Sequence, residues 1–161
     1  MPDKQLIIAT IISLLTGCAA TPVFDISEVN TALTPQLVLK ASVENLGRIA
    51  LWGGTILDIQ NLKDSTHIEI LAYPLDSSQR PDLEDKPIGR FIVHNQGFLD
   101  PVSFSQGQSM SVLGKVGESQ DATIGESSYL YPVIHAQQVH LWSKKKHKTQ
   151  SNFSFGIGIS L

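Results

Sequence analysis

From residue 49 onward, apolar and polar residues alternate in short runs separated by turn-forming residues, and this period of two constrains the fold more than any other feature. Successive side chains of a strand point to opposite faces, so runs of this kind form half-buried strands. Gly53 and Gly54 interrupt the first run, as glycines do at a bulge or a barrel corner. The pattern predicts a mainly β chain with strands at residues 49–59, 66–73, 89–95, 109–116 and 131–142.

One helix is expected before the strands, over residues 35–45. Thr34 can cap its N-terminus, Pro35 suits the first helical position, and Asn45 and Gly47 can end it. A helix followed by about five short antiparallel strands fits a small OB-like β-barrel, because closure of the sheet removes its exposed edges. A β-sandwich is the alternative.

The alternation also assigns side chains to faces, and the segments between strands are expected to be loops. In the second strand one face would carry Ile68, Ile70 and Ala72. In the fourth strand the inward side chains would be Met110, Val112, Gly114 and Val116. In the first strand the apolar face would be Ile49, Leu51, Thr55, Leu57 and Ile59. The expected long loops are 74–87, 97–105 and 117–128.

The single cysteine, Cys18, ends a short apolar run that begins at Leu6 behind a lysine. That run is too short to span a bilayer, which needs roughly 20 apolar residues, but it has the order of a secretory signal. Leu14-Leu15-Thr16-Gly17-Cys18 resembles a bacterial lipobox. It predicts cleavage after Gly17 and a lipid on Cys18. A plain signal peptide cut near Ala20 is the alternative.

The predicted lipid site divides the chain into four parts. These are a signal peptide at 1–17, a lipidated tether at 18–33, a barrel domain at 34–142, and a basic run with an extra strand at 143–161. Fully extended, the tether would reach at most about 50 Å. Residue 19 is alanine rather than aspartate, which by resemblance to bacterial lipoproteins points to the outer membrane. Acylation of the only cysteine excludes a disulfide.

The C-terminal part carries two patterns. Its basic run consists of Lys144, Lys145, Lys146 and Lys148. Such a run can attract an anionic membrane surface or a partner, or can be a solvated turn. Residues 153–161 then alternate strictly, which predicts one more strand that covers the sheet edge or pairs with another protein. The formal net charge of −3 is not that of a nucleic-acid-binding protein.

A series of segments over roughly 35–142 resembles the Slp family, the starvation-inducible outer-membrane lipoproteins of Gram-negative bacteria. In order, they are Trp52-Gly53-Gly54-Thr55-Ile56, Ile68-Glu69-Ile70, Pro74-Leu75-Asp76-Ser77, Arg80-Pro81-Asp82, Gly89-Arg90-Phe91, Gly97-Phe98-Leu99-Asp100-Pro101, Val112-Leu113-Gly114-Lys115-Val116-Gly117, Ile124-Gly125-Glu126, Tyr129-Leu130-Tyr131-Pro132-Val133 and His140-Leu141-Trp142. The resemblance implies an outer-membrane lipoprotein linked to starvation or stationary phase. It transfers no catalytic residues.

The residues themselves favour no enzyme. The sequence has no Gly-x-Ser-x-Gly, no phosphate-binding glycine loop, no His-Glu-x-x-His and no Cys-x-x-Cys, so we expect no catalytic residues, cofactor or metal. His135 and His140 are separated by an odd number of residues, which on a regular strand puts them on opposite faces. His67 and Glu69 share a face, as polar residues on a solvated sheet do.

Partner-binding candidates lie in loops and aromatic positions. Phe98 with Asp100 offers an exposed aromatic ring beside a carboxylate, or else a rigid turn that covers a barrel end. Lys144, Lys145 and Lys146 are the other main candidates. Weaker ones are the charged loop residues Asp76, Arg80 and Asp82, and the aromatic residues Trp52, Tyr129, Tyr131 and Trp142.

The sequence therefore predicts an outer-membrane lipoprotein with a structural or interaction role in the envelope. Its partners would be the membrane, through the lipid, and an envelope protein. A ligand-binding module that takes an oligosaccharide or peptide on an OB-like face is the alternative, and an envelope hydrolase is a third hypothesis.

Overall fold

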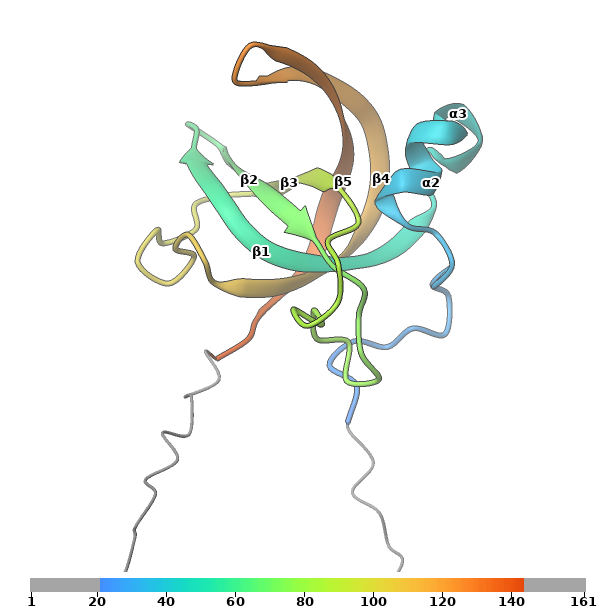
Figure 1. The fold of residues 1–161 in the computed structure, drawn as a ribbon. Helices are drawn as coiled ribbons and strands as arrows, with labels where there is room; N and C mark the ends of the chain where they lie inside the picture. The colour runs from blue at the N-terminus through green and yellow to red at the C-terminus, as the bar shows by residue number, and fades with distance from the viewer. Residues whose placement is uncertain (1–20, 144–161) are drawn as a thin grey trace, which may run out of the picture.

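Five strands close into a barrel in the computed structural model, which describes residues 21–143 (Figure 1). Within these described residues, two short helices precede the strands. The elements are α2 Pro35–Lys40, α3 Ser42–Asn45, β1 Ile49–Asn61, β2 Ser65–Ala72, β3 Arg90–Gln96, β4 Ser109–Ile124 and β5 Ser127–Leu141.

The strand order around the barrel is β1-β2-β3-β5-β4, with β4 pairing back to β1. This confirms the predicted mainly β, OB-like barrel. One detail of the prediction is wrong, because β3 and β5 run parallel, with Ile92 opposite Val133 and His94 opposite His135. The other four pairings are antiparallel.

The predicted helix exists but is broken in the middle. Thr34 caps it, since its hydroxyl accepts from the Leu37 amide at 3.3 Å, and Pro35 occupies the first turn. Ala41 then leaves helical geometry, at φ −144° and ψ 56°, and α3 follows as one further turn. Three of the four residues of α3, Ser42, Val43 and Asn45, have low helix propensity. Within residues 21–143, no helix is long and apolar enough to cross a membrane.

The inward faces of β2 and β4 are those predicted, but that of β1 is the opposite one. Ala50, Trp52 and Ile56 are buried in the core. Ile56 pairs with Ile70 while Asp58 pairs with Glu69, so Leu57 is an extra residue in β1. This bulge reverses the parity of the strand, and of the predicted apolar set only Ile59, beyond the bulge, packs against the core.

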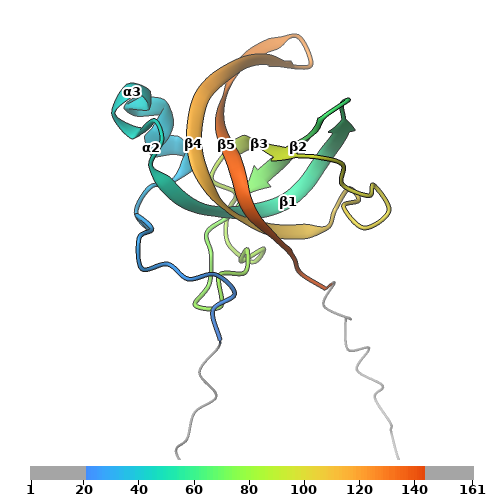
Figure 2. The ribbon, with the colours of Figure 1, turned by 180° about the vertical axis from the view of Figure 1, so that it is seen from behind.

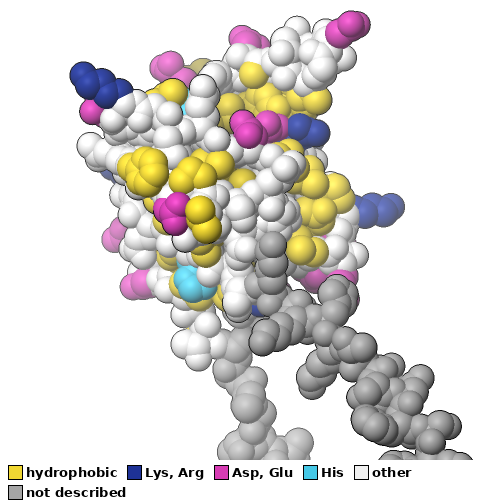
Figure 3. Space-filling view, turned by 90° about the vertical axis from the view of Figure 1, so that its left-hand side faces the viewer, with side chains coloured by type: hydrophobic (Ala, Val, Ile, Leu, Met, Phe, Trp, Pro, Cys, Tyr) yellow, Lys and Arg dark blue, Asp and Glu magenta, His cyan; other side chains and the backbone are white. Residues whose placement is uncertain are grey.

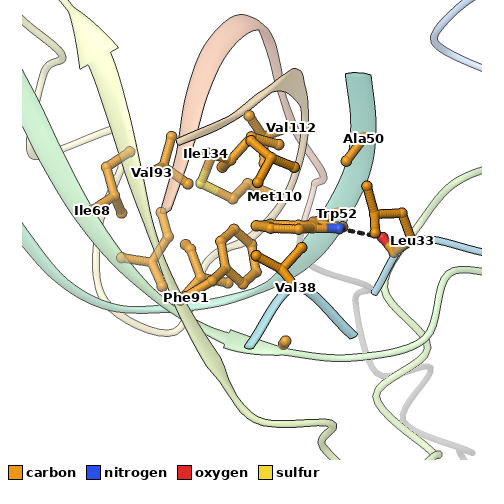
Figure 4. Packing of buried hydrophobic residues seen from close by; sticks show 14 residues of the cluster. Leu33, Val38, Ala50, Trp52, Ile68, Phe91, Val93, Met110, Val112 and Ile134 are labelled. Atoms are coloured by element: carbon orange, nitrogen blue, oxygen red, sulfur yellow. Dashed lines mark hydrogen bonds between the residues drawn. The ribbon is translucent and has the colours of Figure 1, made fainter. Parts of the chain in front are cut away.

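The N-terminal segment supplies part of the core. Val38 of α2 is fully buried, and the Leu33 carbonyl accepts a hydrogen bond from the Trp52 indole N–H at 2.6 Å (Figure 4). The Trp52 ring meets the Phe91 ring edge-on at 5.2 Å. Full burial of such side chains contributes about 1.5–3 kcal/mol each, so the segment before β1 is an integral part of the fold.

Gly54 is needed because β1 and β2 lie very close together at this position, and not because the strand bulges there. A Cβ at Gly54 would lie 1.9 Å from the Leu71 carbonyl oxygen. A side chain there would push β1 and β2 apart.

The expected loop at 117–128 is instead a strand hairpin. β4 continues to Ile124 and β5 starts at Ser127, and together they arch beyond the barrel (Figure 2). Gly125, at φ 61°, is the first central residue of the two-residue turn, where hairpin turns favour glycine. The prediction failed here because the residues are mostly exposed and polar, and the hairpin is held by its backbone ladder.

Candidate functional site

One end of the barrel gathers both ends of the described chain and the loop between β2 and β3. In Figures 1 and 2 the first described residues, the loop at 73–89 and the residues after β5 all lie at this end. We call it the exit end. It is the region where side chains far apart in sequence form a continuous polar network next to a cavity.

Gln79 is the centre of that network. Its side-chain oxygen accepts from the amides of Val23 and Phe24, at 2.9 and 2.7 Å, and its side-chain nitrogen donates to the Phe24 carbonyl at 2.9 Å. Gln79 is 5% exposed, and it is the only non-glycine residue with positive φ, 69°, among residues 21–143. Such a conformation is uncommon and costs energy outside glycine, so the surrounding contacts must hold it.

The loop around Asp76 imposes this conformation. The Asp76 carboxylate accepts from the Ser78 amide, the Ser78 hydroxyl and the Arg80 amide, at 2.8, 2.6 and 3.0 Å. Its backbone amide donates to the Arg80 carbonyl at 2.8 Å. Burial opposes ionisation of the carboxyl group. The hydrogen bonds from Ser78 and Arg80 and the Arg80 charge outweigh it and keep the pKa of Asp76 below its ordinary value.

The same loop also contacts the residues that follow β5. The Ser111 hydroxyl donates to the Gln79 carbonyl at 2.6 Å and accepts from the Trp142 indole at 2.9 Å. The Arg80 guanidinium lies 5.5 Å from the Trp142 ring centre and donates to the Ser143 carbonyl at 2.9 Å. Arg80, which sequence analysis treated as a weak ligand candidate, therefore fixes the last described residue.

These contacts involve residues 23–33 of the segment that the sequence predicts as a tether, 18–33. Phe24 and Leu33 are 4% and 5% exposed, and the chain is fastened from Val23 onward. The sequence alone does not show this attachment, because the residues before α2 have no periodicity and their hydrogen-bond partner, Gln79, lies more than fifty residues away.

A cavity of about 370 Å³ lies at the exit end between the N-terminal segment, β1 and the 73–89 loop. Its walls are mainly apolar, with Ile26, Leu33, Leu51, Trp52, Leu75 and Ile88 among them. Polar groups from Thr31, Asp76 and Ser77 also line it. Cavities of roughly 300–1,000 Å³ with few polar groups are typical of small-molecule sites.

The Phe98 loop presents an exposed ring, and its carboxylate is used internally. Phe98 is 72% exposed and Val102 84%. Asp100 accepts from the Val102 amide at 3.0 Å and from the Ser103 hydroxyl at 3.2 Å, so it stabilises its own turn. Leu99, not Phe98, packs against the core. Figure 3 faces the side of the barrel that carries this loop, and hydrophobic side chains reach the surface there.

Three histidines that sequence analysis did not bring together form a row on the outer face. His67 lies opposite His94 across β2 and β3, and His94 lies opposite His135 across β3 and β5. The first two rings stack at 4.0 Å and the second two meet at 5.3 Å. Burial, then the charges of His67 and His135, lower the pKa of His94 to about 4.

The row does not amount to a metal site. The buried His94 Nε2 has no hydrogen-bond partner. In the described part of the chain, no group of three or more His, Cys, Asp or Glu side chains is arranged to hold a metal ion.

The predicted opposite orientation of His135 and His140 is wrong. Their β4 partners, Lys115 and Ser111, are four residues apart and share a face, because Gln137 is an extra residue in β5. Four residues still correspond to about 13 Å along a strand, so the two side chains do not meet.

The aromatic candidates do not form one platform. Trp52 and Tyr131 are each 3% exposed. The Tyr131 hydroxyl donates to Glu69 at 2.8 Å, and burial, followed by the Glu69 contact, raises the pKa of Tyr131. Arg90 pairs with the same carboxylate at 2.7 Å, and that hydrogen bond raises the pKa of Arg90.

Four candidates from the sequence lie outside the described residues. They are Cys18, Lys144, Lys145 and Lys146.

Comparison with known proteins identifies relatives over most of the chain. The sequence model of the "Outer membrane lipoprotein Slp family" matches residues 15–157. An "Uncharacterized lipoprotein YeaY" of Escherichia coli K12 is 33% identical over 91% of this chain and 74% of its own length. The "Outer membrane protein Slp" of the same organism is 30% identical over 70% of this chain and 61% of its own length.

Two further matches are weaker. An "Uncharacterized protein" of Haemophilus influenzae is 29% identical over 80% of this chain and 70% of its own length. Among solved structures, a small single-stranded DNA-binding protein of Streptomyces coelicolor covers 59% of this chain at 11% identity and a TM-score of 0.35. A TM-score this low is no argument for a shared fold or function.

Proposed function

This chain belongs to the outer membrane lipoprotein Slp family, and from that premise we propose that its barrel is a non-enzymatic interaction module whose exit end is held against the outer membrane. The observation that carries the proposal is that one loop fastens both ends of the described chain. Gln79 holds Phe24, and the adjacent Arg80 holds Ser143.

The first membrane contact is the lipid proposed on Cys18. That residue precedes Val23 by five residues, which span at most about 17 Å. A fully free tether would allow about 50 Å. The exit end therefore stays near the membrane surface. Three acyl chains anchor stably, whereas a single myristoyl chain binds only marginally.

The second membrane contact is the basic run. Lys144 follows directly on Ser143, whose carbonyl Arg80 binds. The lysines therefore start from the same end as the lipid anchor. Each lysine near an anionic surface contributes about 1 kcal/mol. Lys144, Lys145 and Lys146 together would add about 3 kcal/mol at low salt.

An interaction role, not a catalytic one, agrees with how the charged groups at the candidate positions are used. Asp76 and Asp100 each accept hydrogen bonds from their own turns, and Glu69 is paired with Arg90. Among the partner-binding candidates within residues 21–143, Phe98 is the one whose side chain is exposed and not used in its own turn. A starvation role is part of the proposal, and comparing the amounts of the protein in growing and starved cells tests it.

The anchor is tested by replacing Cys18 with serine. Wild-type protein should incorporate labelled palmitate and fractionate with the outer membrane, and the Cys18→Ser variant should do neither. A variant that remains in the membrane fraction, beside a wild type that takes no label, would refute lipidation at this residue.

The basic run is tested on the Cys18→Ser chain, which lacks the lipid. Its binding to vesicles with anionic lipids should fall at least tenfold when Lys144, Lys145 and Lys146 are all changed to Gln, and the remainder should vary little with salt. The matched control changes three exposed lysines elsewhere, Lys40, Lys63 and Lys115, to Gln. Equal losses in both triple variants would refute the placement of this end against the membrane.

A further inference from the structure

The exit-end cavity has the wall chemistry of a site for a hydrocarbon chain. Leu51, Trp52 and Leu75 contribute to its walls, and the N-terminal segment closes one side through Ile26 and Leu33. Glycine at position 53 allows Leu75 and Ser111 to pack closely against β1 in this wall. A Cβ there would lie 2.8 Å from Leu75 Cδ2 and 2.9 Å from the Ser111 hydroxyl. Displacement of water from such walls by CH₂ groups is favourable.

We propose that this cavity binds one acyl chain of a lipid whose polar head is uncharged or zwitterionic. This proposal rests on the proposed position of the exit end against the membrane, which supplies the lipid. This ligand and this site differ from the alternative hypothesis from the sequence, in which an OB-like face binds an oligosaccharide or peptide.

The charge of Asp76 sets the class of head group. Asp76 is one of the residues that line the cavity, and the pKa of its carboxyl group lies below the ordinary value, so the group is ionised at neutral pH. All three of its hydrogen bonds go to one oxygen, Oδ1. The other oxygen, Oδ2, is therefore available to accept from a hydroxyl or ammonium group, whereas a fatty acid would place a second carboxylate beside it.

The position of the cavity identifies the source of the ligand. Pro22 is part of the cavity wall, and Cys18 precedes it by four residues, a span of at most about 14 Å. The cavity therefore lies no farther from the proposed lipid-bearing residue than this four-residue segment can reach. A lipid needs to leave the bilayer by only a short distance to place its chain between Ile26 and Leu75.

Tryptophan quenching by a brominated chain tests the proposal, because one of the two tryptophans of the protein lines the cavity. The full Cys18→Ser chain is titrated with monoolein and with oleate, each with a brominated or unbrominated chain. We expect saturable quenching by the brominated monoolein and at least tenfold weaker binding of oleate. Asp76→Asn keeps the oxygen that accepts the turn hydrogen bonds and removes the charge, so the preference for monoolein should shrink.

A variant in the cavity wall and a matched surface variant distinguish binding in the cavity from nonspecific binding to the protein surface. Ile26→Asp places a charge in the wall, and Val43→Asp places one on α3, where the side chain is 81% exposed. Only the first should weaken monoolein binding, by at least tenfold, while both keep the wild-type melting curve. Equal effects of the two variants, or no quenching by either ligand, would overturn the proposal.

The lipidated protein separates this proposal from the proposed function. Monoolein quenching that persists when the vesicle assay shows no lysine effect would leave the cavity site standing and refute only the membrane placement. Lipidated protein that takes up no monoolein, beside a Cys18→Ser chain that does, would place the protein's own acyl chain in the cavity and overturn the assignment to a separate lipid.

Discussion

Replacement of His94 by phenylalanine should protect the barrel from mild acid. The pKa of His94 is lowered from 6.5 to about 4, first by burial and then by the charges of His67 and His135. The unfolded chain binds this proton near pH 6.5, and the folded chain binds it only near pH 4. The contribution of neutral His94 to the free energy of unfolding is therefore complete above about pH 6.5. It is lost as the pH falls towards 4.

The magnitude follows from the two pKa values. At 1.36 kcal/mol per pKa unit, the displacement corresponds to at most about 3 kcal/mol. The ring is partly exposed and salt screens its neighbours, so we expect about 1–2 kcal/mol. A side-chain hydrogen bond with Gln120 acts on the pKa of His94 in the opposite direction and is outweighed. Lys115 lies opposite His135 on β4, and Glu69 on the same face of β2 is paired with Arg90.

Urea unfolding at pH 7.5, 6, 5 and 4 and constant ionic strength measures the effect. Phenylalanine preserves the stacking partner of His67 but cannot bind a proton. The control is His140→Phe, because His140 packs near Trp142, outside the row. If wild type and His94→Phe lose the same free energy of unfolding between pH 7.5 and 4, the histidine row is not the source of acid sensitivity.

Three further substitutions test the described contacts. Gln79→Ala removes three hydrogen bonds to residues 23–24 and should lower stability by about 1–3 kcal/mol; limited proteolysis should then cut near Phe24, and an uncut variant would contradict the fastening. Gly97→Val places a β-branched residue at φ 83° and should cost about 1–3 kcal/mol in thermal unfolding, whereas an unchanged melting temperature would argue against strain. Gly54→Ala should destabilise by at least about 3 kcal/mol because its Cβ meets the neighbouring strand; a wild-type urea midpoint would contradict that.

The sequence predicted what local periodicity controls. The alternation around Ile68 and Ile70 located the inward face of β2, and Thr34 with Pro35 located the start of the helix. It failed where a single extra residue changes the parity of a strand, at Leu57 in β1 and at Gln137 in β5. A bulge of this kind has no distinctive residue type, so alternation alone cannot show it.

The candidate sites were harder to predict than the fold. The role of Gln79 depends on a loop conformation and on a partner segment distant in sequence, and no local pattern marks either. The histidine row depends on the parallel pairing of β3 and β5. That pairing was not anticipated, so His94 could not be placed beside His135.

The position of β5 between β3 and β4 has a consequence for the order in which the protein folds. Both of those pairings require β5, Ser127–Leu141, the last strand within the described residues, so a nascent or truncated chain that lacks it cannot close the ring. The N-terminal segment should also dock late in folding. Its partner Gln79 accepts a hydrogen bond from Ser111, which in turn accepts one from Trp142, after β5. Contacts of such long sequence separation slow folding. Since the proposed lipid site at Cys18 precedes residues 23–24 and β5 is needed to close the ring, completion of the barrel and docking of residues 23–24 are expected as a single late, rate-limiting event.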